Sequence, residues 1–221
     1  MPTVFSAKLD GSLAVRYHHV SLVTVYLRQA RSRALASVAL PPGEEQFSEA
    51  LLAIICAALC LEAFVNEMGE NILSETDLKD FLMSRKGFHK PDGIGTVSWK
   101  LTTLFQRQWG ERLDGGGTLI LAVEALFELR NALVHYKLGE SAARSYLPPP
   151  AHIVNVETGQ FMTVIDFMQQ PTHVEEPLVS RVRPEAAARA YNAALRVLKE
   201  WNERAAAPAG ALAAHTELPE T

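Results

Sequence analysis

The chain has 221 residues, of which 48% are hydrophobic, and a formal net charge of −4 at pH 7. This length and apolar fraction permit one principal buried core, with or without a small appendage. The acidic balance argues against a protein that coats DNA or RNA through a broad basic surface, although it permits local contacts to RNA.

Secretion, membrane insertion and metal binding receive no support from the sequence. The first ten residues lack a charged stretch followed by an apolar one, and the longest apolar run, residues 50–61, is too short to cross a bilayer. Cys56 and Cys60 lie one helical turn apart, with no second Cys/His pair nearby to complete a zinc site. We therefore expect a cytoplasmic protein with core thiols, no metal and no cofactor.

Four helices are predicted in the first half of the chain. They cover residues 13–39, 44–73, 77–85 and 96–109. The first contains no Gly or Pro, and Pro41-Pro42-Gly43 follows it. The second begins with Glu44 and Glu45, acids suited to the positive end of a helix dipole, and its middle is almost wholly apolar. Such a helix is typical of the centre of a core.

A loop after the third helix gathers basic residues around an aromatic one. Arg85, Lys86, His89 and Lys90 surround Phe88. A loop of this kind can contact an RNA phosphate and stack a base, so Arg85, Lys86 and Lys90 are weak candidates for RNA binding. The alternative is an ordinary solvated loop.

The second half of the chain contains a motif helix, a hairpin and a last helix. The motif helix runs from Thr118, its N-cap, to about Leu138, with Gly139 just beyond its end. Two short β-rich runs flank a Glu-Thr-Gly-Gln turn at 157–160, which is typical of a β-hairpin. Pro184 opens the last helix, and the Ala/Pro-rich tail from Ala205 is expected to be disordered.

These elements predict a mostly α fold, a four- or five-helix bundle with a small β-hairpin inserted before the last helix. The expected organisation is an N-terminal helix and linker (1–43), a helical core (44–145), a Pro-rich linker with the hairpin (146–180), a C-terminal helix packing on the core (181–204) and a disordered tail (205–221).

Arg130 is a permanent charge in the apolar stripe of its helix, because its neighbours one turn away include Phe127 and Val134. An unpaired cation there would be costly, so an anionic partner is expected. Glu62 interrupts the apolar second helix in the same way. We expect Glu62 and Arg130 to meet across the helix interface. The alternative is that each reaches water independently.

Asn131 and His135 lie four residues apart, so they share one side of a helix with access for the Arg130 side chain. This run, Arg-Asn-x3-His, resembles the signature of the HEPN superfamily (higher eukaryotes and prokaryotes nucleotide-binding). Residues 57–67, with their acid at Glu62, resemble the first core helix of that family, and the resemblance spans roughly residues 44–140. Some HEPN toxins carry a modifiable Tyr two residues after the His, where this chain has Lys137.

The three polar residues suit cleavage of RNA, which carries its own nucleophile in the 2′-OH. His135 is the natural proton-transfer residue near neutral pH, and the planar fork of Arg130 suits nonbridging phosphate oxygens. Asn131 can orient the phosphate or the imidazole, and Tyr136 can pack or hydrogen-bond beside them. The resemblance implies a HEPN-like bundle, metal-independent cleavage that leaves a 2′,3′-cyclic phosphate, and a homodimer with the motif helices facing each other.

Three interpretations follow. The first is a HEPN-type endoribonuclease that attacks tRNA or other RNA as a toxin or antiviral-defence component, with an antitoxin protein as its regulator. The second is a noncatalytic HEPN module that binds a nucleotide or a partner. The third is a structural helical protein in which Asn131 and His135 hydrogen-bond to each other and Arg130 caps a buried acid.

Overall fold

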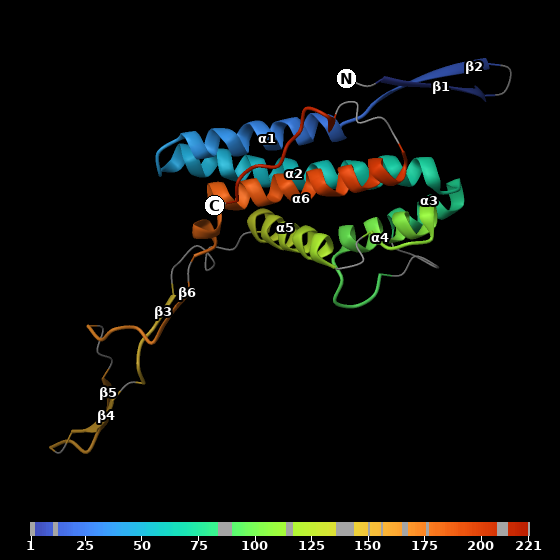
Figure 1. Cartoon of the computed structure of the whole chain (residues 1–221). Coiled ribbons are helices and arrows are strands. Elements are labelled where there is room, and N and C mark those ends of the chain that lie inside the picture. The colour runs from blue at the N-terminus through green and yellow to red at the C-terminus, as the bar shows by residue number, and fades with distance from the viewer. Residues whose placement is uncertain are drawn as a thin grey trace. The chain divides into compact units, whose positions relative to one another are not determined.

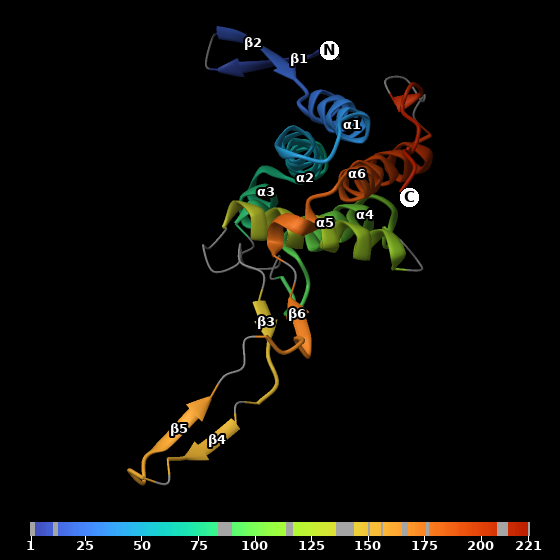
Figure 2. The same cartoon turned by 90° about the vertical axis from the view of Figure 1, so that its left-hand side faces the viewer.

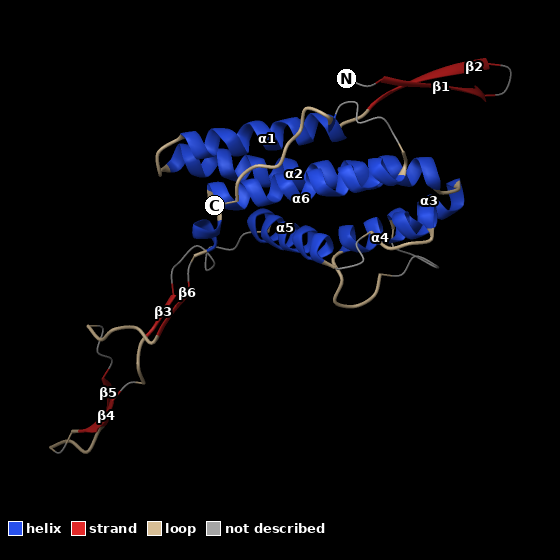
Figure 3. Ribbon diagram, in the orientation of Figure 1, coloured by secondary structure: helices blue, strands red, loops and turns tan. Residues whose placement is uncertain are grey.

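The computed structural model describes residues 3–10, 13–83, 90–113, 117–135, 144–149, 151–155, 157–164, 168–175, 177–206 and 212–220. The chain divides into two compact units, one formed by Met1–Val134 with Val182–Thr221 and the other by His135–Arg181. Within the described residues it is mostly helical, as expected, with six α-helices and three two-stranded antiparallel sheets (Figure 3).

Helices make up most of the first unit. They are α1 (Val23–Ala39), α2 (Glu44–Ile72), α3 (Glu75–Leu82), α4 (Thr96–Trp109), α5 (Thr118–Val134) and α6 (Pro184–Arg204). α1, α2 and α6 pack against one another, and α4 and α5 cover the side of α2 and α6 that faces away from α1 (Figures 1 and 2). This arrangement places α5, which carries the Arg-Asn pair, beside the central helix α2.

Local signals in the sequence determine where several helices begin and end. The Ser74 hydroxyl accepts a hydrogen bond from the Asp77 N–H at 3.2 Å and so caps α3. α4 ends at Gly110, whose φ of 73° lies in the left-handed region that glycine adopts without strain. Pro184 occupies the first turn of α6, where its missing N–H costs nothing.

α2 is the core of the bundle. An aromatic cluster joins it to α4 and α6, because Phe64, Phe105, Trp109 and Trp201 pack with neighbouring ring centroids 4.5–5.2 Å apart. Of the described helices, α2 alone is long and apolar enough to cross a membrane. The apolar run 50–61 is too short for this by itself, but it is only part of the helix. Half of its most apolar window is buried inside the fold.

The predicted helix over residues 13–39 is wrong in its first part. Leu13–Val20 is strand β2, which pairs antiparallel with β1 (Thr3–Asp10), and α1 begins only at Val23. Asp10 pairs with Leu13, which leaves only Gly11-Ser12 between the strands. A two-residue connection with Gly, between runs rich in β-branched and aromatic residues, is a hairpin signal that outweighs the absence of helix breakers.

The expectation of a disordered tail is also wrong for residues 212–220. Leu218 is only 9% exposed, and its N–H and C=O bond to the side chain of Asn192 on α6. The composition of the tail is an average over all its residues. It therefore does not indicate the few residues that bind the tail to α6.

The second unit contains β3 (Arg144–Tyr146), β4 (Ala151–Val154), β5 (Phe161–Val164), β6 (His173–Glu175) and a short 3-10 helix (Leu178–Arg181). β4 and β5 form the predicted hairpin, in which the Asn155 side chain accepts the N–H groups of Glu157 and Thr158 at 3.0 and 3.1 Å. β3 and β6 form a second antiparallel ladder. Strands of three residues are too short to show a sequence period, so this ladder was not predicted.

α5 ends at Val134, four residues before the predicted end at Leu138, and His135 lies in a turn. Val134 is already 53% exposed. Further turns would lack the core contacts that supply most of the stability of a helix in a protein. Tyr136, Leu138 and Gly139 lie outside the described residues.

Candidate functional site

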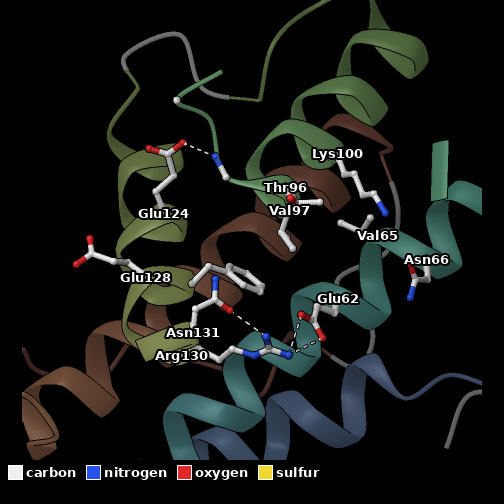
Figure 4. A pocket seen from close by; sticks show the side chains of 13 residues that line it. Glu62, Val65, Asn66, Thr96, Val97, Lys100, Glu124, Glu128, Arg130 and Asn131 are labelled. Carbon is white, nitrogen blue, oxygen red and sulfur yellow. Dashed lines mark hydrogen bonds and ion pairs between the residues drawn. The ribbon is translucent and has the colours of Figure 1, made fainter. Parts of the chain in front are cut away.

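α2, the beginning of α4 and α5 enclose a cleft of about 610 Å³. Each helix contributes polar side chains to it (Figure 4). They are Glu62 and Asn66 from α2, Thr96 and Lys100 from α4, and Glu124, Glu128, Arg130 and Asn131 from α5. The volume falls within the range of about 300–1,000 Å³ typical of small-molecule sites.

Arg130 and Glu62 form an ion pair at one end of this cleft, which confirms that they meet across the interface of α2 and α5. Arg130 Nη2 lies 3.2 Å from Glu62 Oε1 and 3.5 Å from Oε2. The two side chains are 22% and 31% exposed, so both are partly desolvated but reachable from solvent. Phe127 and Leu129, both buried, hold this part of α5 against the core. The guanidinium is therefore presented at the margin of the core.

Asn131 holds the same guanidinium from the other side. Its Oδ1 accepts a hydrogen bond of 3.0 Å from Arg130 Nη1, so both terminal nitrogens of the arginine are engaged (Figure 4). Asn131 thus orients the arginine, a role that differs from the expected ones toward the phosphate or the imidazole. A guanidinium has five N–H groups in one plane. After the bonds to Glu62 and Asn131, N–H donors remain in that plane for an anion.

The side chains that line the cleft carry a net negative charge, which does not favour binding of a polyanion along the whole cleft. Three carboxylates, Glu62, Glu124 and Glu128, face two cations, Arg130 and Lys100, which gives a formal charge of −1. An anion therefore has one favourable end, at Arg130.

Lys100, which also lines the cleft, is anchored by α3. Its Nζ donates to the carbonyl of Leu82 at 3.1 Å and lies 5.2 Å from the centroid of the Phe81 ring. Burial lowers the pKa of Lys100, and the Glu62 carboxylate opposes that shift. The ammonium therefore ties α4 to α3, and Lys100 and Arg130 are the two cations that line the cleft.

Sequence reasoning missed Lys100, Glu124 and Glu128 as cleft residues. Glu124 accepts a 3.5 Å hydrogen bond from the Gly95 N–H, which places its carboxylate at the positive end of α4. A signal was present, because Glu124, Glu128 and Asn131 follow the spacing i, i+4, i+7 and so form one polar stripe on α5.

His135 is exposed and is the first residue after α5. It belongs to the second unit, whereas Arg130 and Asn131 belong to the first. Because the helix ends at Val134, the spacing of four from Asn131 no longer places the imidazole on the same helix face. Its convergence with Arg130 stays a prediction.

Of the remaining candidates, only Lys90 lies within the described residues. Tyr136, Arg85 and Lys86 lie outside the described residues. Lys90 is exposed, and its Nζ donates to the carbonyls of Ile94 at 2.7 Å and Pro91 at 3.4 Å. Its ammonium therefore bonds to the backbone of its own loop.

Comparisons with protein-family models, with curated proteins and with solved structures found no match to the chain. The cleft between α2, α4 and α5, with its oriented arginine, is the feature of the described structure most suited to chemistry.

Proposed function

We propose that the chain is a HEPN-type endoribonuclease that needs no metal and cleaves RNA by attack of the 2′-OH on the adjacent phosphate. The products are a 2′,3′-cyclic phosphate and a 5′-OH. The observation that supports this proposal most is the Arg130 guanidinium, held by Glu62 and Asn131 at the end of the cleft. The sequence resemblance of α2 and α5 to the HEPN family adds to it.

Arg130 would bind the nonbridging oxygens of the scissile phosphate. The pentavalent transition state carries more negative charge than the phosphodiester, so an oriented cation stabilises the transition state more than the ground state. Glu62 and Asn131 restrict the rotation of the guanidinium before the substrate binds, which reduces the cost of ordering it. Their role in catalysis is therefore to position Arg130.

His135 would move the protons. Cleavage requires that the 2′-OH loses a proton and that the departing 5′-oxygen gains one, and imidazole performs both tasks near neutral pH. The His135 side chain is exposed, so a substrate can reach it.

A homodimer would supply a second imidazole and a second arginine. α5 exposes Leu121 at 63% and Val134 at 53%, two apolar side chains that another copy of the chain can contact. We propose that two copies of α5 face each other and that RNA, with tRNA as a candidate, lies between them. A role as a toxin or antiviral-defence component, controlled by an antitoxin protein, extends this proposal.

A noncatalytic HEPN module that binds a nucleotide or a partner is the alternative function. The net negative cleft favours it, because such a site suits a small ligand with one anionic group and several hydrogen-bond donors better than an RNA backbone.

The test is incubation of labelled tRNA in EDTA with the wild type, Arg130→Ala, Arg130→Lys and His135→Ala. Arg189→Ala, which removes an exposed arginine of α6, is the control. We expect cleavage by the wild type and the control only, with cyclic phosphate ends. Arg130→Lys keeps the charge but loses the planar fork, so it should lose most of the activity.

Nucleotide binding by the wild type without cleavage, abolished in Arg130→Ala, would support the alternative. Cleavage by folded Arg130→Ala at the wild-type rate would exclude the proposed role of Arg130.

A further inference from the structure

The C-terminal segment, residues 212–220, lies on α6 beside α1 (Figures 1 and 2). The surface that it meets, called here the tail-binding face, consists of Arg28 and Arg31 of α1 and Tyr191, Asn192, Arg196 and Lys199 of α6.

Asn192 hydrogen-bonds to the backbone of the segment. Its Nδ2 donates to the Leu218 carbonyl and its Oδ1 accepts the Leu218 N–H, both at 2.8 Å. Asn192 is 1% exposed and Leu218 is 9% exposed, so these hydrogen bonds are shielded from water. A side-chain amide that pairs with both backbone groups of one residue recognises an extended peptide whatever its other side chains.

Side chains of the segment add ion pairs and further hydrogen bonds to this contact. Arg196 Nη2 lies 2.5 Å from Glu217 Oε2 and 3.4 Å from Glu220 Oε1. The Tyr191 hydroxyl lies 3.0 Å from His215 Nδ1 and 3.2 Å from the Thr216 carbonyl oxygen, to which it donates. The pattern recognised is therefore a leucine with one carboxylate directly before it and another two residues after it.

The segment leaves the tail-binding face with a surplus of positive charge. Four cations, Arg28, Arg31, Arg196 and Lys199, face two carboxylates, Glu217 and Glu220, so the face carries two surplus positive charges. Among the described residues, the buried Nε–H of Arg31 has no hydrogen-bond partner, although the Arg31 side chain also hydrogen-bonds to Tyr191.

The electrostatic effect of nearby cations on His215 agrees with a surplus of positive charge on this face. Burial, followed by Arg31, Arg28 and Lys199, lowers the pKa of His215. The described part of the tail before Glu217 has an imidazole and no carboxylate to meet these cations.

We propose that the tail-binding face is a peptide-recognition site for an extended acidic segment of a partner protein, which displaces the chain's own tail. The partner segment has the pattern Glu-Leu-x-Glu and further carboxylates before it. Those carboxylates meet Arg28, Arg31 and Lys199, whose positive charges exceed what the tail's two carboxylates neutralise. The tail thereby acts as the resident occupant of the same site within the chain.

The experiment uses the full chain with Leu218→Asp, which removes the buried leucine and frees the face. A fluorescent peptide of residues 212–221 and an acidic version with Ala213→Glu and Ala214→Glu are titrated by anisotropy. We expect both to bind, and the acidic peptide about fivefold more tightly, since each exposed ion pair contributes up to a few-fold in affinity. Adding Arg196→Ala or Asn192→Asp should weaken binding about tenfold or more, whereas adding Arg189→Ala, which removes an exposed arginine of the same helix, should not.

Hydrogen exchange on the wild type provides the second measurement, which does not depend on the Leu218→Asp fold. The acidic peptide should speed amide exchange of residues 212–220 while the rest of α6 stays protected. Absence of peptide binding, equal affinity of the two peptides, or unchanged exchange of the tail at saturation would each overturn the proposal.

Discussion

Glu62→Gln removes the carboxylate charge that holds Arg130 while keeping the shape of the side chain. Exposed ion pairs contribute about 0.2–1 kcal/mol, and breaking a fully buried pair costs about 3–5 kcal/mol. With exposures of 31% for Glu62 and 22% for Arg130, this pair lies between the two cases. We expect Glu62→Gln to lower the free energy of unfolding by about 1–2 kcal/mol, or Tm by about 2–8 °C.

The control is Glu75→Gln on α3. The pair of Glu75 with Lys79 spans 3.8 Å, and its side chains are 91% and 75% exposed, so its loss should cost less than about 0.5 kcal/mol. Denaturant unfolding of Glu62→Gln, Arg130→Met and the double variant isolates the coupling energy between the two side chains. A coupling energy of zero, or equal effects of Glu62→Gln and Glu75→Gln, would refute the reasoning.

Three further predictions concern the fold. Burial, followed by nearby cations, lowers the pKa of His215 below its usual 6.5, so the unfolded chain binds that proton more tightly and stability should fall as pH drops below about 6.5. Thermal unfolding from about pH 5 to 7.5 should show this slope, and His215→Gln should flatten it. Burial raises the pKa of both thiols, most strongly for Cys60, so a thiol reagent at about pH 8 should modify Cys56 slowly and Cys60 only after unfolding. Phe105→Ala empties a fully buried site in the aromatic cluster and should cost about 3–5 kcal/mol in denaturant unfolding.

The helices of the bundle were predictable because their signals are local. Glu44 and Glu45 begin α2, Gly110 ends α4 and Pro184 begins α6, each through the geometry of a few neighbouring residues. The contact between Glu62 and Arg130 was predictable for a different reason. A charge on an apolar helix face requires a partner, and two such charges on two core helices require each other.

Other features depend on contacts that no local pattern contains. Lys100 enters the cleft because α3 and α4 are placed together, and its sequence neighbours show no conflict that would single it out. Ala and Pro dominate the tail and so predict disorder, whereas Leu218 is buried and hydrogen-bonds to Asn192. The end of α5 depends on where the chain leaves the core. The sequence therefore could not show that α5 ends at Val134, before His135.

Use of the substrate's own 2′-OH is the most direct measure of the proposed chemistry. Two RNA oligonucleotides of the same sequence, one with 2′-O-methyl groups throughout, are incubated with the wild type in EDTA, and their ends are identified by mass. Since methylation removes the nucleophile and leaves the phosphates for Arg130, we predict that both bind and only the unmodified RNA is cut, leaving a 2′,3′-cyclic phosphate. Equal cleavage of the two oligonucleotides, or a 5′-phosphate at the cut, would contradict the proposal.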